Sequence, residues 1–270
     1  MRFLRLIKIS RPVFYFAPIF VFLTGMKLAG DIVFSPLVIL ELIFFTLPYS
    51  LFLFGINDVF DYESDKLNPR KDSFLGGARL KKKELRTVYT LSMLGALPLL
   101  ITSFFSMNFV HILACFLVLF VSYFYSAPPL RLKELPIIDS VSNALVIFFV
   151  VAMGFVLTKS FFLIPFKVYM ALFFVASLHA MGAAADIRSD RKAKHKTIAT
   201  QFGRVATVSF SIICTLTAFV LGRFSLIISA VLLLCLLSYV VALFKPGATK
   251  LMFYLACIIS LIGGLVWILF

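Results

Sequence analysis

The chain has 270 residues, of which 62% are hydrophobic, 16% are aromatic and only 14% are charged. Because so few charged residues cannot cover a water-facing surface, the composition excludes a soluble globular protein. The high hydrophobic content also excludes a disordered chain. A membrane-spanning helix uses about 20 apolar residues, and the apolar content could supply about eight or nine such helices. The formal net charge is +14, from 26 Lys and Arg against 12 Asp and Glu.

Nine apolar runs with few charges predict an all-α polytopic membrane protein, whose helices we expect to surround a central cavity. The first run follows a basic N-terminal stretch and continues to Leu28 without a small-residue cleavage site, so we interpret it as a retained span. The runs lie near residues 12–30, 35–56, 85–104, 108–126, 137–158, 162–185, 204–222, 224–243 and 251–270.

The Lys and Arg residues predict how the spans are oriented. With a cytoplasmic N-terminus, all but four of the 26 Lys and Arg fall on the cytoplasmic side, the exceptions being Lys27, Lys159, Lys167 and Arg223. The positive-inside rule favours this topology, and the basic side also suits contact with anionic membrane lipids. Because the basic residues are spread over short loops, we do not expect a nucleic-acid partner, and the sequence names no protein partner.

The acidic residues of the predicted cytoplasmic side are concentrated in two short stretches. The first begins with Asn57 and contains Asp58, Asp61 and Asp65 at the end of the second apolar run. If the helix continues there, the three aspartates lie within an arc of roughly 60° on one face. The second stretch places Asp186 and Asp190 at the end of the sixth run, four residues apart and again on one helix face.

Carboxylates that share a helix face repel one another, so a bound cation is expected to stabilise them. Mg²⁺ prefers one or two carboxylates together with waters and phosphate oxygens, and Asn57 could add a neutral oxygen ligand. Neither stretch has the spacing or the glycine of an EF-hand calcium loop. The alternative is that these acids are solvated loop residues that balance the nearby basic ones.

Both acidic stretches are expected on the same side of the membrane, which suggests a parallel internal duplication. Two metal-binding clusters facing each other across a helical cavity would bind a diphosphate. Basic side chains near the two stretches could bind its oxygens, and they are Arg70, Lys71, Arg131, Lys133, Arg188, Arg191, Lys192 and Lys196.

These motifs resemble the UbiA superfamily of intramembrane prenyltransferases. The similarity covers most of the chain and includes Ser10-Arg11-Pro12 before the first span, the pattern N-D-x-x-D-x-x-x-D from Asn57, the stretch from Tyr125 to Lys133, and the pair Asp186 and Asp190. The resemblance implies one transmembrane prenyltransferase domain over residues 1–270, with aspartate-rich loops at 57–84 and 186–203.

Among the subfamilies, the sequence is most similar to lycopene elongases, which make C50 carotenoids and in some cases also hydrate the new end group. The similar stretches are NDVFDYESDKLNPRK from Asn57 and YSAPPLRLKELP from Tyr125. Lys194 stands where the family pattern usually has Gly. This difference concerns the conformation of the turn after Asp190, because Gly permits backbone angles that Lys resists.

The resemblance also implies a reaction. Asn57 and the aspartates Asp58, Asp61, Asp65, Asp186 and Asp190 would bind two or more Mg²⁺ ions, with the five aspartates as the catalytic residues. The bound prenyl diphosphate would ionise to an allylic carbocation, and a lipophilic acceptor would attack it. The active site would lie on the cytoplasmic side of the membrane.

The acceptor is the least constrained part of this prediction. Lycopene needs no charged anchor, and polar groups such as Asn143 and His179 are expected to face an acceptor cavity inside the bundle. His179 could also take up the released proton. The alternatives are prenylation of an aromatic or quinone precursor of the hydroxybenzoate, naphthoate or homogentisate type, an ion transporter, and a scaffold without chemistry.

Overall fold

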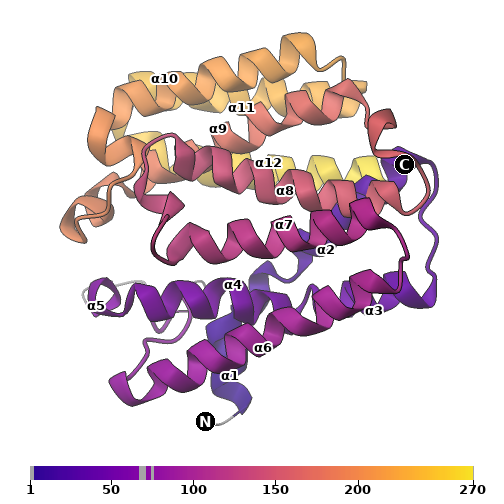
Figure 1. Cartoon of the computed structure of the whole chain (residues 1–270). Helices are drawn as coiled ribbons and strands as arrows, with labels where there is room; N and C mark the ends of the chain where they lie inside the picture. Colours follow the sequence, from indigo (N-terminus) through magenta and orange to yellow (C-terminus); the bar gives the residue numbers. More distant parts are fainter. Residues whose placement is uncertain (1–2, 67–70, 74–75, 270) are drawn as a thin grey trace. The chain divides into compact units, whose positions relative to one another are not determined.

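The computed structural model describes residues 3–66, 71–73 and 76–269, and these form helices joined by short turns (Figure 1). Within this part of the chain, nine helical segments are long and apolar enough to span a membrane, which confirms the predicted fold class. The segments are Pro12–Ala29, Pro36–Phe60, Lys82–Phe104, Phe109–Ser126, Ile138–Val156, Phe166–Lys192, Ile198–Leu221, Leu226–Phe244 and Pro246–Leu269.

The helices group into two compact units. Unit 1 runs up to Arg131 and adds Phe149–Ile164, whereas unit 2 consists of Leu132–Phe148 and the chain from Pro165 onward. The helices that begin in unit 1 are α1 Phe3–Ser10, α2 Phe16–Ala29, α3 Pro36–Phe44, α4 Leu47–Phe60, α5 Tyr62–Asp65, α6 Leu85–Phe104 and α7 Phe109–Ser126. The helices that begin in unit 2 are α8 Ile138–Val156, α9 Phe166–Lys192, α10 Ile198–Leu221, α11 Leu226–Phe244 and α12 Thr249–Leu269.

Short 3₁₀ turns join several of these helices, and they are η1 Pro12–Phe14, η2 Lys82–Glu84, η3 Leu132–Glu134, η4 Phe161–Leu163 and η5 Pro246–Ala248.

The second predicted span is divided into two helices, which corrects the expectation of one continuous helix. Helix α3 ends at Phe44 and α4 begins at Leu47, with Pro48 in the first turn of α4. Proline has no backbone N–H and cannot continue the hydrogen-bond ladder of a preceding helix. The Thr46 hydroxyl instead donates to the carbonyl of Ile43 at the break.

In unit 1, α4 packs against α1, α6 and α7, and it carries the first acidic stretch at its end. Helices α4 and α6 approach closely through glycines, since a Cβ atom on Gly95 would lie 2.6 Å from the carbonyl oxygen of Pro48. Small residues allow this close backbone contact in membrane proteins. A polar contact joins α4 to its other neighbour α7, because the buried Tyr49 and Ser122 hydroxyls lie 2.9 Å apart.

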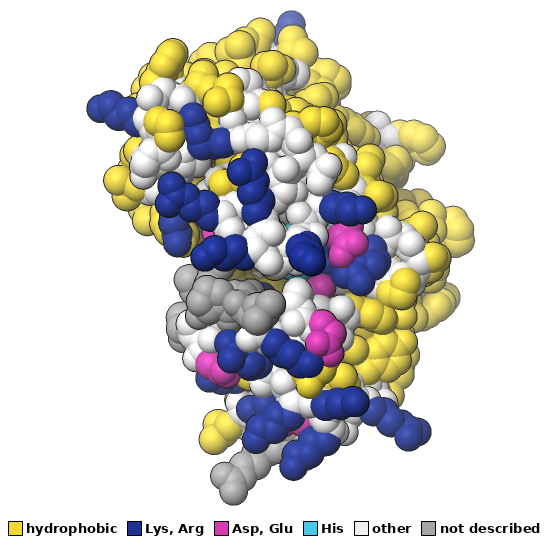
Figure 2. Space-filling model, turned by 90° about the vertical axis from the view of Figure 1, so that its left-hand side faces the viewer, with side chains coloured by type: hydrophobic (Ala, Val, Ile, Leu, Met, Phe, Trp, Pro, Cys, Tyr) yellow, Lys and Arg dark blue, Asp and Glu magenta, His cyan; other side chains and the backbone are white. Residues whose placement is uncertain are grey.

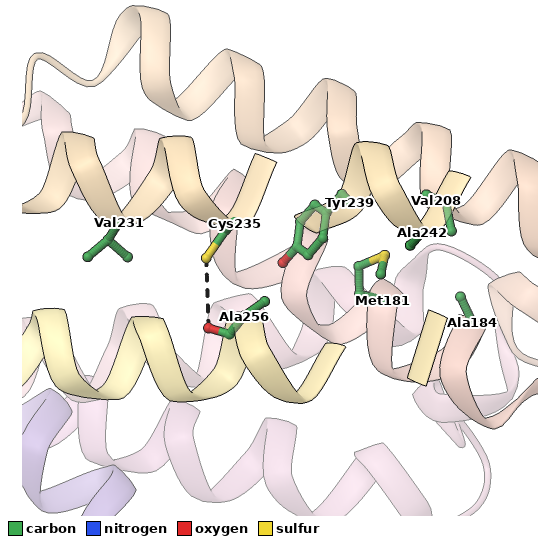
Figure 3. Packing of buried hydrophobic residues seen from close by; sticks show 8 residues of the cluster. All are labelled: Met181, Ala184, Val208, Val231, Cys235, Tyr239, Ala242 and Ala256. Carbon is green, nitrogen blue, oxygen red and sulfur yellow. Dashed lines mark hydrogen bonds between the residues drawn. The ribbon is translucent and has the colours of Figure 1, made fainter. Parts of the chain in front are cut away.

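In unit 2, α9 packs against α10 and α12, and α11 packs against α10 and α12. Figure 3 shows the buried cluster between these helices, in which the Cys235 thiol donates to the carbonyl of Ala256 over 3.7 Å. The cluster fixes α9, which carries the second acidic stretch. Its members are Met181, Ala184, Val208, Val231, Cys235, Tyr239, Ala242 and Ala256.

Candidate active site

The first acidic stretch lies at a slight break in the helix. Helix α4 ends at Phe60, and Asp61, with φ −98° and ψ 9°, links it to α5. Helical hydrogen bonds continue across the break, because the amide of Asp61 donates to Asn57 over 2.9 Å and the amide of Asp65 donates to Asp61 over 2.8 Å. The predicted spacing is therefore kept, and Asp58, Asp61 and Asp65 are all at most 9% exposed.

Two basic side chains bind the buried carboxylates of this stretch. The Lys71 ammonium lies 2.6 Å from Oδ1 of Asp58 and 2.7 Å from Oδ2 of Asp65, and its side chain is only 2% exposed. The Arg11 guanidinium lies 2.6 Å from the same Asp58 oxygen. The positive charges reduce the repulsion between carboxylates that share one helix face.

Arg131 joins the group from the end of unit 1, with its guanidinium 3.5 Å from Oδ1 of Asp61. Both arginines have left-handed backbone conformations, with φ 52° at Arg11 and φ 41° at Arg131. Such conformations cost non-glycine residues about 1 kcal/mol or more and are concentrated at functional sites. The two turns therefore direct guanidinium groups toward the aspartates at an energetic cost.

Asn57 is held beside the aspartates through its amide nitrogen, which donates to the Ser126 hydroxyl over 2.9 Å at the end of α7. That bond uses the amide nitrogen and not the amide oxygen of the side chain. An amide oxygen is a suitable ligand for a hard cation.

No three His, Cys, Asp or Glu side chains within the described ranges lie close enough together to hold a metal ion. The Lys71 ammonium instead lies between Asp58 and Asp65. The donor set still fits Mg²⁺, since that ion needs only one or two carboxylates beside waters and phosphate oxygens. Oδ2 of Asp58 is buried and has no hydrogen-bond partner within the described part of the chain, which leaves one carboxylate oxygen for such a ligand.

The second acidic stretch lies in an uninterrupted helix. Asp186 and Asp190 both belong to α9, which continues past the predicted end of the span to Lys192, so they are one turn apart on one face as predicted. The Ser189 hydroxyl donates to the backbone carbonyl of Asp186, and the amide of His195 donates to that of Asp190. Both aspartates are partly exposed.

Lys194 forms the turn that follows α9, and its φ of 58° is the left-handed conformation that glycine adopts without strain. Lys194 thus has the backbone conformation that glycine, the residue usual at this place in the family pattern, adopts easily. The strain falls on this turn, and the helical placement of the two aspartates is unaffected.

The other predicted cations are placed as follows. Arg188, Arg191, Lys192 and Lys196 are exposed at the end of α9 or just after it, and Lys133 is half-buried in η3. Arg70 lies outside the described residues. On the side of the molecule that it draws, Figure 2 shows many Lys and Arg side chains, with hydrophobic side chains toward the edges of the view.

An exposed ion pair next to the site does not belong to it. Lys66 lies 2.7 Å from Glu63, and both side chains are largely exposed. The hydrogen bond to Glu63 raises the pKa of the Lys66 ammonium above its ordinary value.

The two predicted acceptor residues both lie in unit 2 and are partly exposed. His179, on α9, lies with its Nδ1 atom 3.1 Å from the Ser140 hydroxyl of α8. Asn143 follows Ser140 by three residues and shares its face of α8.

Three further polar residues were not predicted as part of a site. Arg11 binds Asp58, Asp139 lies behind Ser140 at 1% exposure, and Glu41 is fully buried against His111. A signal existed for Glu41, since an ionisable residue within an apolar run is a functional or structural site by default. Arg11 and Asp139 lie at the ends of apolar runs, where charges are ordinary.

Comparison with known proteins assigns the chain to a family. The sequence model of the UbiA prenyltransferase family matches residues 18–269. A lycopene elongase/hydratase of Haloarcula japonica is 33% identical over 235 residues, which cover 85% of this chain and 77% of the relative. A lycopene elongase/hydratase of Corynebacterium glutamicum is 33% identical over 67% of this chain and 64% of its own length.

Solved structures show the same fold. A UbiA homologue from Archaeoglobus fulgidus bound to DMAPP and Mg²⁺ has a TM-score of 0.70 and 22% identity, with 96% of each chain covered. The apo structure of a UbiA homologue from Aeropyrum pernix has a TM-score of 0.69 and 20% identity, with 100% of each chain covered. This fold, and the match of the family model over most of the sequence, leave the ion-transporter and scaffold alternatives without support: the chain is an intramembrane enzyme and belongs to the UbiA prenyltransferase family.

Proposed function

We propose that this prenyltransferase transfers an isoprenyl group from an allylic diphosphate to lycopene or a related carotenoid. The relatives from Haloarcula japonica and Corynebacterium glutamicum are lycopene elongase/hydratases, and a third, from a Dietzia species, is a C50 β-cyclic carotenoid biosynthesis protein that is 33% identical over 66% of this chain and 41% of its own length. The homologue from Archaeoglobus fulgidus has been solved with DMAPP or GPP together with Mg²⁺. These matches support both the donor and the acceptor.

One observation supports the placement of the donor site: Asp58 is completely buried, yet among the residues that the structure describes only one of its two carboxylate oxygens has a hydrogen-bond partner. A buried carboxylate oxygen without a partner costs about 1–3 kcal/mol, so such a group calls for an explanation. A cation that binds this oxygen together with the diphosphate would explain it. Asn57, Asp61 and Asp65 lie along the same helix end, and Asp186 and Asp190 form the second acidic group.

Two or more Mg²⁺ ions bound by these acids would supply neutralising charge for the departing diphosphate. The basic residues of the chain complete that neutralisation. Lys71 and Arg131 donate to diphosphate oxygens beside the first acidic stretch, and Arg188 and Lys196 donate beside the second, with Arg70 and Lys133 as further donors. Charge-assisted hydrogen bonds of this kind strengthen as negative charge collects on the leaving group.

The chemical step that these residues promote is ionisation of an allylic C–O bond, in which the diphosphate keeps the electron pair. A double bond of the acceptor then supplies two electrons for the new C–C bond, and the resulting cation loses a proton. The apolar helices exclude water, which would otherwise capture the cation. Lycopene needs no charged anchor in such surroundings, whereas a hydroxybenzoate would carry a carboxylate that must be paired.

We also propose that the acidic helix ends face the cytoplasm. With that orientation, the Lys and Arg residues follow the positive-inside rule, and the water-soluble diphosphate reaches the site from the compartment where it is made. A cysteine-labelling experiment with a membrane-impermeant reagent tests this orientation. A single cysteine introduced for exposed Lys192 should react only after the cytoplasmic side is opened, and reaction in intact cells would contradict the orientation.

The test of the function is expression in a host that accumulates lycopene, followed by mass spectrometry of the pigments. We expect products heavier by one and two C5 units, with or without added water. Asp58→Asn should abolish them, whereas Asp31→Asn, which changes an exposed acid far along the chain from both acidic stretches, should leave them unchanged. In membranes from the same cells, EDTA should stop product formation and excess Mg²⁺ should restore it.

Unaltered lycopene, in cells that contain the folded protein, would overturn the carotenoid acceptor. Labelled allylic diphosphate with hydroxybenzoate, naphthoate or homogentisate would then test the aromatic alternative. Normal product formation by Asp58→Asn would overturn the proposed donor site.

A further inference from the structure

A buried carboxylate, a hydroxyl and a histidine form a chain of hydrogen bonds within unit 2. Oδ1 of Asp139 accepts from the backbone amide of Ser140 over 2.7 Å and from its hydroxyl over 3.2 Å. The other oxygen of Asp139 faces the amide of Ile198, the first residue of α10, at 3.4 Å. The Ser140 hydroxyl in turn lies 3.1 Å from Nδ1 of His179.

The single hydroxyl proton of Ser140 determines which histidine tautomer is present. Because that proton is donated to Asp139, the Ser140 oxygen can only accept from the histidine ring. Nδ1 of His179 therefore carries the hydrogen, and Nε2 carries the lone pair. A neutral imidazole with its lone pair on Nε2 is a base, and Asp139 lies behind the serine on the opposite side of the ring.

The location of His179 fits a role in the reaction. It precedes Asp186 by seven residues on α9, so it lies on the same helix face about 10.5 Å further along the axis. That position lies within the apolar span of α9, where a hydrocarbon acceptor is expected. Asp139 and Ser140 are at most 1% exposed, whereas His179 is partly exposed, so the histidine is the least buried member of the chain of bonds.

We propose that His179 is the general base that removes the proton from the prenylated acceptor, and that Ser140 and Asp139 are positioning residues that fix its tautomer. This inference rests on the proposed prenyl transfer. After the acceptor double bond has attacked the allylic cation, the positive charge lies on the acceptor. The electron pair of an adjacent C–H bond then forms the new double bond, and its proton moves to Nε2 of His179. The imidazolium later releases this proton to water.

The experiment compares two products of one reaction mixture, released diphosphate and prenylated acceptor, with purified protein in lipid nanodiscs, Mg²⁺ and labelled allylic diphosphate. In the wild type the two should form together. In His179→Gln, ionisation continues but proton loss is impaired, so the prenylated alkene should fall by about 10²-fold or more. Water capture of the cation should then raise the ratio of diphosphate to prenylated alkene at least tenfold, as prenyl alcohol or hydrated acceptor accumulates.

Two variants separate chemistry from folding. Ser140→Ala should raise the same ratio less than His179→Gln, and Ser140→Thr, which keeps the hydroxyl, should restore the wild-type ratio. The control is His111→Gln, which alters the fully buried histidine of α7 and should lower the amount of folded protein without changing the ratio. KM for the diphosphate should stay within about threefold of wild type in His179→Gln, because the base acts after the donor is bound.

A wild-type ratio in His179→Gln would overturn the inference, and so would a parallel fall of both products in protein that still binds the diphosphate. The ratio can be measured with an aromatic acceptor as well, since that acceptor also loses a proton on prenylation. Failure of the wild type to release diphosphate with any acceptor would instead count against the proposed function itself.

Discussion

Two histidines lie within membrane-spanning helices near a buried acid, and the structure uses them differently. In unit 1, Nε2 of His111 lies 2.7 Å from Glu41 and Nδ1 lies 2.9 Å from the carbonyl of Met153, with both side chains fully buried. In unit 2, a serine hydroxyl separates His179 from Asp139, and the histidine is partly exposed.

The direct pair in unit 1 joins three helices, α3, α7 and the end of α8. Since a carbonyl oxygen only accepts, Nδ1 of His111 must carry a hydrogen, and one proton is then shared between Nε2 and Glu41. The pair has no net charge in either proton arrangement, which suits a membrane interior. With both ring nitrogens occupied, His111 holds the helices together and has no atom left for a substrate.

The comparison teaches that a buried acid near a histidine does not by itself indicate catalysis. Unit 2 differs because the Ser140 hydroxyl stands between Asp139 and Nδ1 of His179. The basic nitrogen, Nε2, is then on the side of the ring away from the acid. Removing each partner in turn should separate a structural histidine from a chemical one.

The largest expected effect is on the direct pair. His111→Leu leaves the Glu41 carboxyl buried without its partner, which should lower the free energy of unfolding by about 3–5 kcal/mol. The double substitution Glu41→Leu with His111→Leu should recover most of that loss. Thermal unfolding in detergent measures both. If the double variant were no more stable than the single one, the loss would come from packing and not from the unpaired acid.

A third buried acidic group has a cation as its partner. Lys71→Met removes the ammonium that lies between Asp58 and Asp65, so a metal ion no longer has to displace it. We expect Mg²⁺ to bind about tenfold more tightly without diphosphate, or about 1.4 kcal/mol, and diphosphate to bind more weakly.

The shift of the unfolding temperature with Mg²⁺ concentration measures this change. Lys66→Met, which alters an exposed lysine of the same stretch, is the control and should leave the Mg²⁺ dependence unchanged. A weaker response to Mg²⁺ in Lys71→Met would mean that the lysine supports the metal ligands instead of competing with the ion.

His179→Leu should have a smaller effect on stability than His111→Leu. Ser140 and the amide of Ile198 continue to bond Asp139 in this variant, so no buried charge loses its last partner. We expect a loss of about 1 kcal/mol or less in the free energy of unfolding. A loss as large as that of His111→Leu would place both histidines in the same structural role.

The smallest effect is expected at the turn that follows α9. Lys194→Gly relieves the left-handed conformation at φ 58° and should raise the free energy of unfolding by up to about 1 kcal/mol, reduced by the greater freedom of glycine in the unfolded chain. Glycine can adopt the same backbone conformation, so the turn should still place the amide of Ile198 against Asp139. Prenyl transfer should therefore be retained. Lys192→Gly, at the last residue of α9, relieves no such strain and should not raise the free energy of unfolding.

Much of the fold was predictable because long apolar runs have few alternatives to membrane-spanning helices. The nine predicted runs correspond to the nine segments of the described chain, and helical hydrogen bonds continue from Asn57 to Asp65 across the break at Asp61. The break between Phe44 and Leu47 was not expected, although Pro48 could have indicated it. Hydropathy does not register such a break, since Phe45 and Thr46 continue the apolar run.

The site residues were predicted less completely. The aspartates and Asn57 follow from their spacing on helix faces, and the roles assigned to them and to the predicted cations stay predictions until activity is measured. Arg11 was not predicted as a partner of Asp58, because 47 residues separate them in the sequence and a basic residue before the first span is explained by topology alone. Asp139 was missed because an acidic residue at the start of a helix is ordinary and does not by itself indicate a site.

The sequence by itself determined the class of protein, the number of its apolar spans, and the helix faces on which its acids lie, because each depends on hydropathy and on the helical period within a continuous segment. Only the tertiary structure decided which charges meet. Lys71 between two aspartates, Glu41 against His111, and Ser140 between Asp139 and His179 all join residues that packing brings together across different segments. A hydrogen bond depends on distances of a few tenths of an ångström, which no local pattern of residues specifies.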